Sequence, residues 1–589
     1  MRRYCALFAL LSVAFSLTAL AQGHGNGSLA GTGESRSAPI LDNLGEHHRT
    51  ISTYLPAAQR YFDQGLRLMF AFNVEEAERA FRAAVEIDPT CAMCSWGVAL
   101  ALGPHINFPA TPERTVAAAA AAAEGLRRAG SATPVERALI QAVARRYSDP
   151  PPATPEDQAA LDLAYADAMR AVAKSHPSDV DVAYLAAEAL LNLHPWDLYT
   201  TGGEPKDWTP EIVALLERAL ELAPDHAGLC HLYIHAVEAS KTPERAVAAA
   251  ERLRTRMPGA GHLVHMPSHI FQRVGRYADS ALANERAVAA DGAYLPKAGN
   301  FMIYPMYAAH NHQFLWFAAQ MEGRSAAAYG AARDTAARLP AEMLRAMPGY
   351  DGWLAYPVWT LVRFGRWQGV LAEPMPPAEF VYATAVTHMA RAVAQARLGN
   401  LEASGMESAE AERQYALLPA EAFQGFNPVT ALAQIARSLA AAEVARARGD
   451  WDTAVAKLAE AVTVEDGLRY NEPSDWYFPV RHHLGPILLE AGRNEAAEAL
   501  FRADLERNPE NGWALTGLAA ALRRQGKEIQ AASVERRLVF AWSRADLELD
   551  RLAAPPRTER AFAAASARGE GGARGAGMSG GAQPSRAAE

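Results

Sequence analysis

The sequence predicts an all-α protein built as an array of short, stacked helices. Apolar residues recur at helical spacing in segments such as 76–88, 211–223 and 495–507, and the alternation typical of strands is scarce. Four Thr-Pro-Glu triplets each combine a capping hydroxyl, a proline suited to the first turn and an acid facing the helix dipole. These triplets begin at Thr111, Thr154, Thr209 and Thr242. Such repeated helix starts are typical of stacked helical hairpins.

A pattern of large, small and proline residues recurs along the chain over the length of two helices. Its first copy is Tyr61, Gly65, Leu68, Ala77, Phe81, Ala84 and Pro89. A second copy is Leu484, Gly485, Leu488, Gly492, Ala497, Phe501 and Pro509, and a third is Gly449, Ala454, Leu458 and Ala461. The pattern resembles the tetratricopeptide repeat (TPR) superfamily. The resemblance implies a TPR-type α-solenoid, a right-handed superhelix of antiparallel helix pairs with a concave groove.

The resemblance covers most of the chain from about Tyr61 to Ala541, with degenerate copies between Leu295 and Ser438. We expect a TPR-like solenoid over residues 46–545, preceded by a flexible lead at 22–45 and followed by a disordered tail at 546–589. The clearest repeats lie at about 58–91, 227–260, 261–291, 435–464, 478–511 and 512–545.

The first residues predict a signal peptide at 1–21. Arg2 and Arg3 precede an apolar stretch that ends in the small-x-small site Ala19-Leu20-Ala21. No later apolar run approaches the roughly 18 residues needed to span a bilayer. We therefore expect a periplasmic or secreted protein without a membrane span.

The charge and motif content exclude several classes of function. The formal net charge is −9, and Lys and Arg form no stripe, which argues against a nucleic-acid partner. Phosphate-loop, dinucleotide and nucleophile-elbow motifs are missing from any suitable strand-to-helix context. The zincin motif H-E-x-x-H is missing too, so no motif names a metal or a reaction.

Four histidines recur on a 34-residue period, which is the length of one TPR unit. His231 and His235 have i, i+4 spacing, and His265 and His269 follow each of them 34 residues later. Residues three or four apart share a helix face, so each pair should present two imidazoles on one side. Pro267 lies within the second pair and should kink its helix, which leaves the geometry of that pair open.

In the TPR superfamily, the second, fifth, ninth and twelfth residues of a unit line the concave groove, and the resemblance carries this rule to the present chain. His231, His235 and Glu238 then take the fifth, ninth and twelfth places of one unit. His262, His265 and His269 take the second, fifth and ninth places of the next. Counting further places Glu188 at a ninth position and His310 at a second. The candidate metal ligands are His231, His235, His262, His265, His269, His310, Glu188 and Glu238.

Three interpretations of this cluster remain open from the sequence. Imidazoles with carboxylates suit Zn, Cu or Fe, in a scaffold or in a metal-dependent oxidoreductase or hydrolase. Alternatively, the histidines donate hydrogen bonds to a peptide or protein in the groove of an adaptor, or they are structural. Convergence of the imidazole nitrogens would favour a metal, whereas side chains splayed along the groove would favour the adaptor.

Long aromatic connections interrupt the array and are candidates for lids. They are His194 to Trp208, Gly292 to Ala309, Pro348 to Trp359 and Gly467 to Pro479. Connections of this length are often functional, although TPR proteins also tolerate inserts.

Cys91 and Cys94 form a C-x-x-C motif just after the helix-ending Pro89. The motif lacks the following His of haem attachment and the βαβ context of a thioredoxin. Three states stay open: a local disulfide, a soft-metal or redox site, and free thiols. Cys230 is expected to be a buried core thiol.

Overall fold

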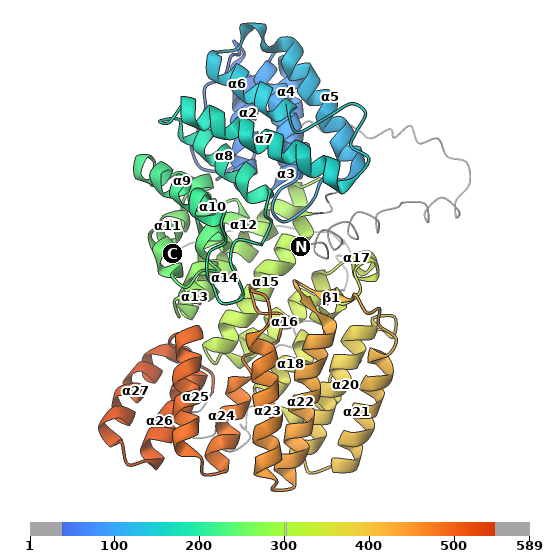
Figure 1. The fold of residues 1–589 in the computed structure, drawn as a ribbon, viewed down its shortest axis with the longest axis vertical. Coiled ribbons are helices and arrows are strands. Elements are labelled where there is room, and N and C mark those ends of the chain that lie inside the picture. The colour runs from blue at the N-terminus through green and yellow to red at the C-terminus, as the bar shows by residue number, and fades with distance from the viewer. Residues whose placement is uncertain (1–37, 300, 302, 548–589) are drawn as a thin grey trace, which may run out of the picture.

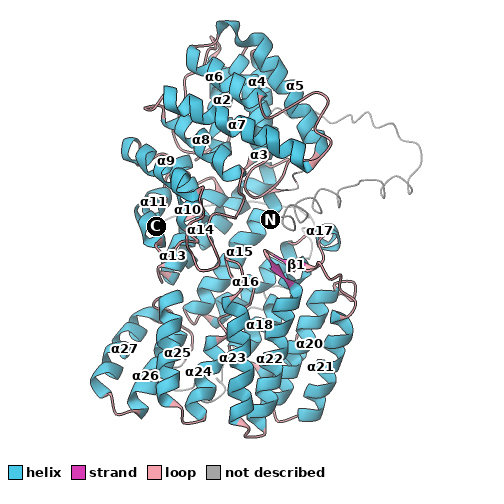
Figure 2. Ribbon diagram, in the orientation of Figure 1, coloured by secondary structure: helices cyan, strands magenta, loops and turns pink. Residues whose placement is uncertain are grey.

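The computed structural model describes residues 38–299, 301 and 303–547, and helices make up nearly all of its ordered elements (Figures 1 and 2). Within these residues the one sheet is a two-stranded ribbon, in which β1 (Phe423–Gln424) pairs antiparallel with β2 (Asn427–Pro428). The predicted signal peptide, residues 22–37 of the lead and residues 548–589 of the tail lie outside the described residues.

The N-terminal half contains the helices that lead to the histidine repeats. They are α2 (Pro56–Phe70), α3 (Val74–Ile87), α4 (Ala92–Leu102), α5 (Pro112–Arg128), η2 (Ala129–Ser131), α6 (Pro134–Ala144), α7 (Pro155–Ser175), α8 (Val180–Asn192), α9 (Thr209–Leu222), α10 (Ala227–Val237), η3 (Pro243–Ala246), α11 (Val247–Leu253), α12 (Gly261–His265), α13 (Pro267–Arg273) and α14 (Tyr277–Tyr294).

The C-terminal half continues the array of helices. Its helices are η4 (Leu295–Lys297), α15 (Tyr304–Met321), α16 (Ser325–Arg338), α17 (Ala341–Ala346), η5 (Tyr350–Ala355), α18 (Tyr356–Arg363), α19 (Trp367–Ala372), α20 (Val381–Arg397), α21 (Leu401–Tyr415), α22 (Val429–Ala447), α23 (Trp451–Asp466), α24 (Arg481–Glu490), α25 (Asn494–Arg507), α26 (Gly512–Arg524) and α27 (Glu528–Ala541).

The marker residues of the repeat explain how the helices pack. The buried ring of Phe81 lies against Gly65 on one side and Gly97 on the other, so closely that a Cβ at either glycine would overlap the ring. Phe501 sits between Gly485 and Gly517 in the same way near the other end of the chain. One large side chain inserted between two small ones allows three successive helices to pack tightly. The predicted all-α, TPR-type α-solenoid of helix pairs is confirmed.

The copies between Leu295 and Ser438, degenerate in sequence, are nevertheless helix pairs. The turn after α18 passes through Gly365 at φ +65°, and the turn after α20 passes through Gly399 at φ +84°. Glycine occupies this left-handed region without steric cost, so it ends the first helix and starts the second. The hairpin turn is therefore kept where the large marker residues are lost.

The last repeat folds back onto the middle of the array. The indole of Trp542 donates to the carbonyl of Met321 at 3.0 Å, and the indole of Trp513 donates to that of Gln320 at 2.8 Å. Asp546 accepts from the backbone N–H groups at the start of α16, at 2.7 and 2.9 Å. The C-terminal half is thus closed between the α15–α16 turn and α27.

Two local expectations differ from the structure. Residues 38–45, expected to be part of a flexible lead, pack against α2: Ala38 and Leu44 are each 4% exposed, and the Tyr61 hydroxyl donates to the Ala38 carbonyl.

Of the Thr-Pro-Glu triplets, those at Thr111 and Thr154 cap their helices through the hydroxyl. The hydroxyl of Thr209 bonds to a loop carbonyl instead.

Among the described helices, none combines the length and the apolar character that crossing a bilayer demands.

Candidate functional site

The six predicted histidines come together in the middle of the molecule, on first helices of consecutive repeats. α10 carries His231 and His235, α12 carries His262 and His265, α13 carries His269 and α15 carries His310. All but His310 are at most 6% exposed. We call these six residues the histidine cluster.

Pro267 divides the predicted helix into α12 and α13 but does not separate its histidines. Met266, at the junction, keeps right-handed helical angles, with φ −51° and ψ −37°. The Nε2 atoms of His265 and His269 consequently lie 2.8 Å apart. The proline kink thus preserves the i, i+4 pair, which settles a question that the sequence left open.

The histidine cluster divides into two groups of three. In one, single nitrogens of His231, His235 and His262 all lie within 4.8 Å of one another. In the other, the same holds for His265, His269 and His310. We call these groups triad 1 and triad 2. The imidazoles of each triad converge and are not splayed along a groove.

In five of the six imidazoles, Nδ1 is held by an oxygen atom. Nε2 is then left without a partner in His231 and His235, whereas the Nε2 atoms of His265 and His269 lie within hydrogen-bond distance of each other. The acceptors are the Phe70 carbonyl for His231 (2.7 Å), Glu238 for His235 (2.9 Å), Asn284 for His265 (2.7 Å), Glu238 for His269 (2.5 Å) and Gln313 for His310 (2.8 Å). The amide groups of Asn284 and Gln313 each donate elsewhere, which fixes the oxygen toward the imidazole. Metal-binding histidines are usually oriented in this way.

Several of these nitrogens are buried without a hydrogen-bond partner. They are Nε2 of His231, Nε2 of His235 and both ring nitrogens of His262. An unpaired polar atom in the interior costs roughly 1–3 kcal/mol. A cluster of such atoms aimed at one another is therefore expensive unless something binds between them.

Two buried carboxylates stand next to triad 2. Glu238 spans both triads, since one oxygen accepts from His235 and the other from His269. Glu472 places an oxygen 2.9 Å from Nδ1 of His269. Glu238, predicted as a ligand, has both oxygens engaged by imidazoles, so in this arrangement it orients the rings of His235 and His269.

Burial keeps most of the histidine cluster neutral. It lowers the pKa of His231, His262 and His265 well below the usual value and that of His310 to about 3. For His269, burial also acts to lower the pKa, but the charge of Glu238 and the hydrogen bonds to both carboxylates raise it to about 10. Neutral imidazoles are the form that binds metal ions.

Two aromatic residues that pack on the histidine cluster have strained backbones. Phe72 at φ +52° contacts the rings of His231, His235 and His262 at 4.2–5.9 Å between centroids. Trp196 at φ +56° meets His235 edge-on at 5.2 Å. Left-handed angles are costly for bulky side chains and gather at functional sites. Phe72 follows α2 directly, and no repeat pattern marked it in the sequence.

Three of the four long aromatic connections contact the histidine cluster, and the fourth reaches it through Gln313. Trp196 contacts His235; Tyr307 contacts His262 at 4.4 Å between ring centroids; Tyr356 accepts from the Gln313 amide that holds His310; and Glu472 approaches His269. The connections were candidates for lids, and the structure places them around one centre. Glu472 comes from one of them, and its role was not marked by any repeat position.

Trp196, which covers His235, is in contact with two other segments of the chain. Trp196 contacts the ring of Phe426 at the tip of the β1–β2 ribbon, at 5.8 Å. Arg469 donates to the Trp196 carbonyl at 3.4 Å and lies over the Phe426 ring. Three connections distant in sequence therefore meet above triad 1.

Glu188, predicted at the same groove, lies in a different environment. One of its oxygens bonds to the side-chain amide of Asn192, and the positive charge of Arg146 is near. Burial nevertheless raises the pKa of Glu188. It is not in any of the groups of converging donor atoms among the described residues.

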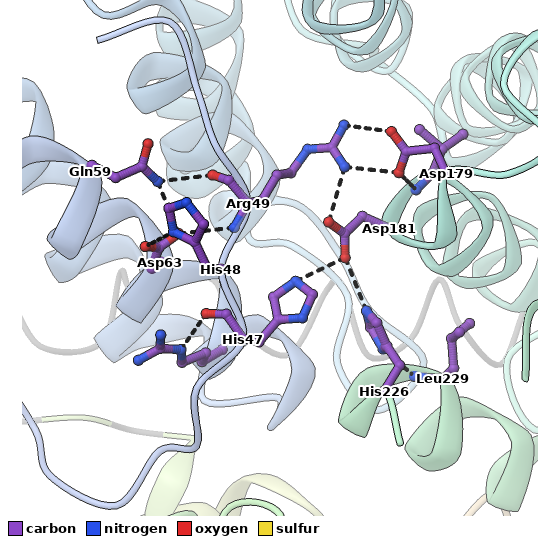
Figure 3. A network of polar contacts seen from close by, with 11 residues as sticks. His47, His48, Arg49, Gln59, Asp63, Asp179, Asp181, His226 and Leu229 are labelled. Carbon is purple, nitrogen blue, oxygen red and sulfur yellow. Dashed lines mark hydrogen bonds and ion pairs between the residues drawn. The ribbon is translucent and has the colours of Figure 1, made fainter. Parts of the chain in front are cut away.

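A second histidine–carboxylate group has the opposite hydrogen-bond pattern. His47 and His226 both approach one oxygen of Asp181, at 3.0 and 2.9 Å (Figure 3). Nδ1 of His226 accepts from the Leu229 N–H, so its Nε2 carries the proton donated to Asp181. Arg49 engages the other oxygen of Asp181 at 2.9 Å. These contacts tie the segment before α2 to the start of α8 and the start of α10.

Of the states predicted for the cysteines, the structure has the local disulfide and the buried core thiol. Cys91 and Cys94 form a disulfide at the start of α4, where the Cys94 N–H donates to Cys91 Sγ at 3.0 Å. Cys230 is a free, fully buried thiol, and burial raises its pKa to about 12.

No protein-family model and no curated protein matches the chain. Among solved structures it is similar to the human IFIT1 dimer with m7Gppp-AAAA, at 12% identity over 83% of this chain and 91% of that one, with a TM-score of 0.29. It is also similar to the APC/C hetero-tetramer Cut9-Hcn1 (13% identity, 82% and 76%, TM-score 0.29) and to yeast Tom70 (11% identity, 87% and 96%, TM-score 0.29). Similarity at this TM-score supports no conclusion about function.

Proposed function

We propose that this protein is an exported TPR scaffold that binds a transition metal in the histidine cluster. The observation that carries the proposal is the convergence of buried imidazole nitrogens in two groups of three, among which Nε2 of His231, Nε2 of His235 and both ring nitrogens of His262 have no hydrogen-bond partner. A protein that used these histidines only for packing would gain nothing from leaving their lone pairs unpaired.

The donor set limits the identity of the metal. Neutral imidazoles suit Zn, Cu and Fe, whereas Ca and Mg prefer oxygen ligands. The two carboxylates nearest the cluster bond to imidazole Nδ1 atoms, where they raise the basicity of the ligands and fix their direction. We therefore propose Zn, Cu or Fe as the bound metal.

A plain adaptor is supported less well, because the histidines are buried and covered by aromatic side chains. A peptide or protein partner in the TPR groove, which we also propose, would contact other residues. The disulfide between Cys91 and Cys94 supports export, since such bonds persist in oxidising compartments. We accordingly propose a periplasmic or secreted location.

A metal-dependent oxidoreductase or hydrolase is a second candidate function. It is favoured by the cover of Trp196, Phe426 and Arg469, because a lid that excludes water is common in enzymes. An enzyme would also need a coordination position free for substrate.

The test of the proposed function is elemental analysis of the mature protein purified without a His tag or chelator. We expect near-stoichiometric Zn, Cu or Fe, and we expect it to be lost when His235→Ala and His269→Ala are combined. His388→Ala serves as the matched control, since His388 bonds to Glu407 outside the cluster and should not affect metal content. A folded double variant with full metal occupancy, or a native protein that stays metal-free after reconstitution, would refute the proposal.

A further inference from the structure

We infer that the histidine cluster holds two metal ions side by side, one in triad 1 and one in triad 2. This inference rests on the proposed function and adds the number of ions and the ligands of each. Three independent features support it: the repeat register of the ligands, the spacing of their nitrogens and the position of Glu238.

The repeat register duplicates one ligand set. Triad 1 consists of the fifth and ninth residues of one unit, His231 and His235, with the second residue of the next unit, His262. Triad 2 consists of the fifth and ninth residues of that next unit, His265 and His269, with the second residue of the unit after it, His310. Equivalent residues in consecutive TPR units occupy equivalent places on the array. The two triads are therefore two copies of one site, displaced by a single repeat.

The spacing of the nitrogens suits one ion in each triad. Imidazole nitrogens lie about 2.0–2.1 Å from a bound Zn ion, so ligands of one ion stay within about 4.2 Å of each other. Within each triad three nitrogens already lie within 4.8 Å of one another. Each triad supplies three imidazoles, and side-chain rotations that bring their nitrogens closer together would complete the coordination.

The triads are in contact, and one carboxylate fixes them relative to each other. The rings of His235 and His269 are 5.6 Å apart, and those of His262 and His265 are 5.8 Å apart. Glu238 uses one oxygen for His235 in triad 1 and the other for His269 in triad 2. A group that holds one ligand of each site couples their positions. Three imidazoles also leave a four-coordinate ion one position for a small non-protein ligand.

The inference is tested by counting ions in single-triad variants. Full-length mature protein is reconstituted with Zn(II), desalted and analysed for metal per chain, and the series is repeated with Cu(II). We expect two ions in the native protein, one in His262→Ala and one in His310→Ala. We expect none when His262→Ala and His310→Ala are combined. His388→Ala should keep two, and circular dichroism checks that each variant is folded.

The outcomes separate this inference from the proposed function. One ion in the native protein would overturn the pair of sites and leave the proposed function standing. No ion would overturn both. Loss of both ions in a folded single-triad variant would overturn the assignment of one ion to each triad. If an alanine variant does not fold, His262→Gln and His310→Gln retain more of the side-chain volume and decide the count.

Discussion

His235 and His269, which are 34 residues apart, are held by the two oxygens of a single buried carboxylate, that of Glu238. One side chain therefore sets the orientation of an imidazole in each of two consecutive repeats.

Replacement of Glu238 tests this shared role. In Glu238→Gln, one of the two Nδ1–H groups would face an amide N–H in place of an oxygen, so its ring would lose its orientation. We expect metal affinity to fall by about 10–100-fold, the usual effect of losing such a partner. Competition with a chromophoric chelator measures it. Glu443→Gln removes another buried carboxylate, one that faces Arg397, and should leave the affinity unchanged. Equal affinities in the two variants would contradict the role of Glu238.

Trp196 should control how quickly the metal leaves. Its removal in Trp196→Ala opens the cover over His235, and the lost aromatic contact is worth about 1 kcal/mol. We expect transfer of the metal to excess chelator to become about fivefold faster, because 1.4 kcal/mol corresponds to a factor of ten in rate. Trp208 belongs to the same connection but stacks on His194 at 3.9 Å. Trp208→Ala should release metal at the native rate, and an acceleration as large as that of Trp196→Ala would argue against a lid.

The disulfide between Cys91 and Cys94 should contribute to stability and not to metal binding. It closes a loop of only four residues, so the chain-entropy model assigns it about 2 kcal/mol. We expect Cys91→Ser combined with Cys94→Ser to lower the free energy of unfolding by about this amount in urea titrations. Metal content should not change. A drop in bound metal would instead make the pair part of the metal site.

Asp291 should make the stability of the fold depend on pH. Burial raises its pKa to about 6, above the usual 3.8, although Tyr304 and Asn311 donate to it. The folded state therefore prefers the protonated acid. Its contribution is fully present below about pH 4 and is lost as the pH rises to about 6, by about 3 kcal/mol.

The variant Asp291→Asn should remove this dependence. Asn311 can turn its unpaired Oδ1 toward the new amide and keep the hydrogen bond. We expect the stability of the variant relative to the native protein to increase between pH 4 and pH 7, as measured by urea unfolding. Asp452→Asn, at an exposed position, should show no such trend. A constant difference for Asp291→Asn across this range would show that Asp291 ionises normally.

Repeat arithmetic predicted which histidines converge, because a position in a TPR unit fixes the face on which its side chain lies. The 34-residue period placed His231, His235, His265 and His269 together, and the same register added His262 and His310. The marker residues Gly65 and Phe81 were likewise predictable, because they contact each other between neighbouring helices and their spacing in the sequence follows from that contact.

The rest of the site lay beyond that arithmetic. Glu472 and Trp196 come from irregular connections whose course depends on tertiary contacts, so no periodicity places them. Glu188 has the correct register, but it bonds to Asn192 and lies near the charge of Arg146. The position of a residue in the repeat fixes the face of the helix on which its side chain lies. The distance from that side chain to the histidine cluster depends on the geometry of the superhelix.

The return of α27 to the α15–α16 turn has a mechanical consequence. An open solenoid can fray from its free end one repeat at a time, since each unit contacts only its neighbours. Here, peeling away the last repeat would also break the contacts of Trp542 and Asp546 with the middle of the chain. The last described repeat is therefore anchored to the middle of the chain, and the repeats between α15 and α27 should resist stretching and proteolysis as a closed loop.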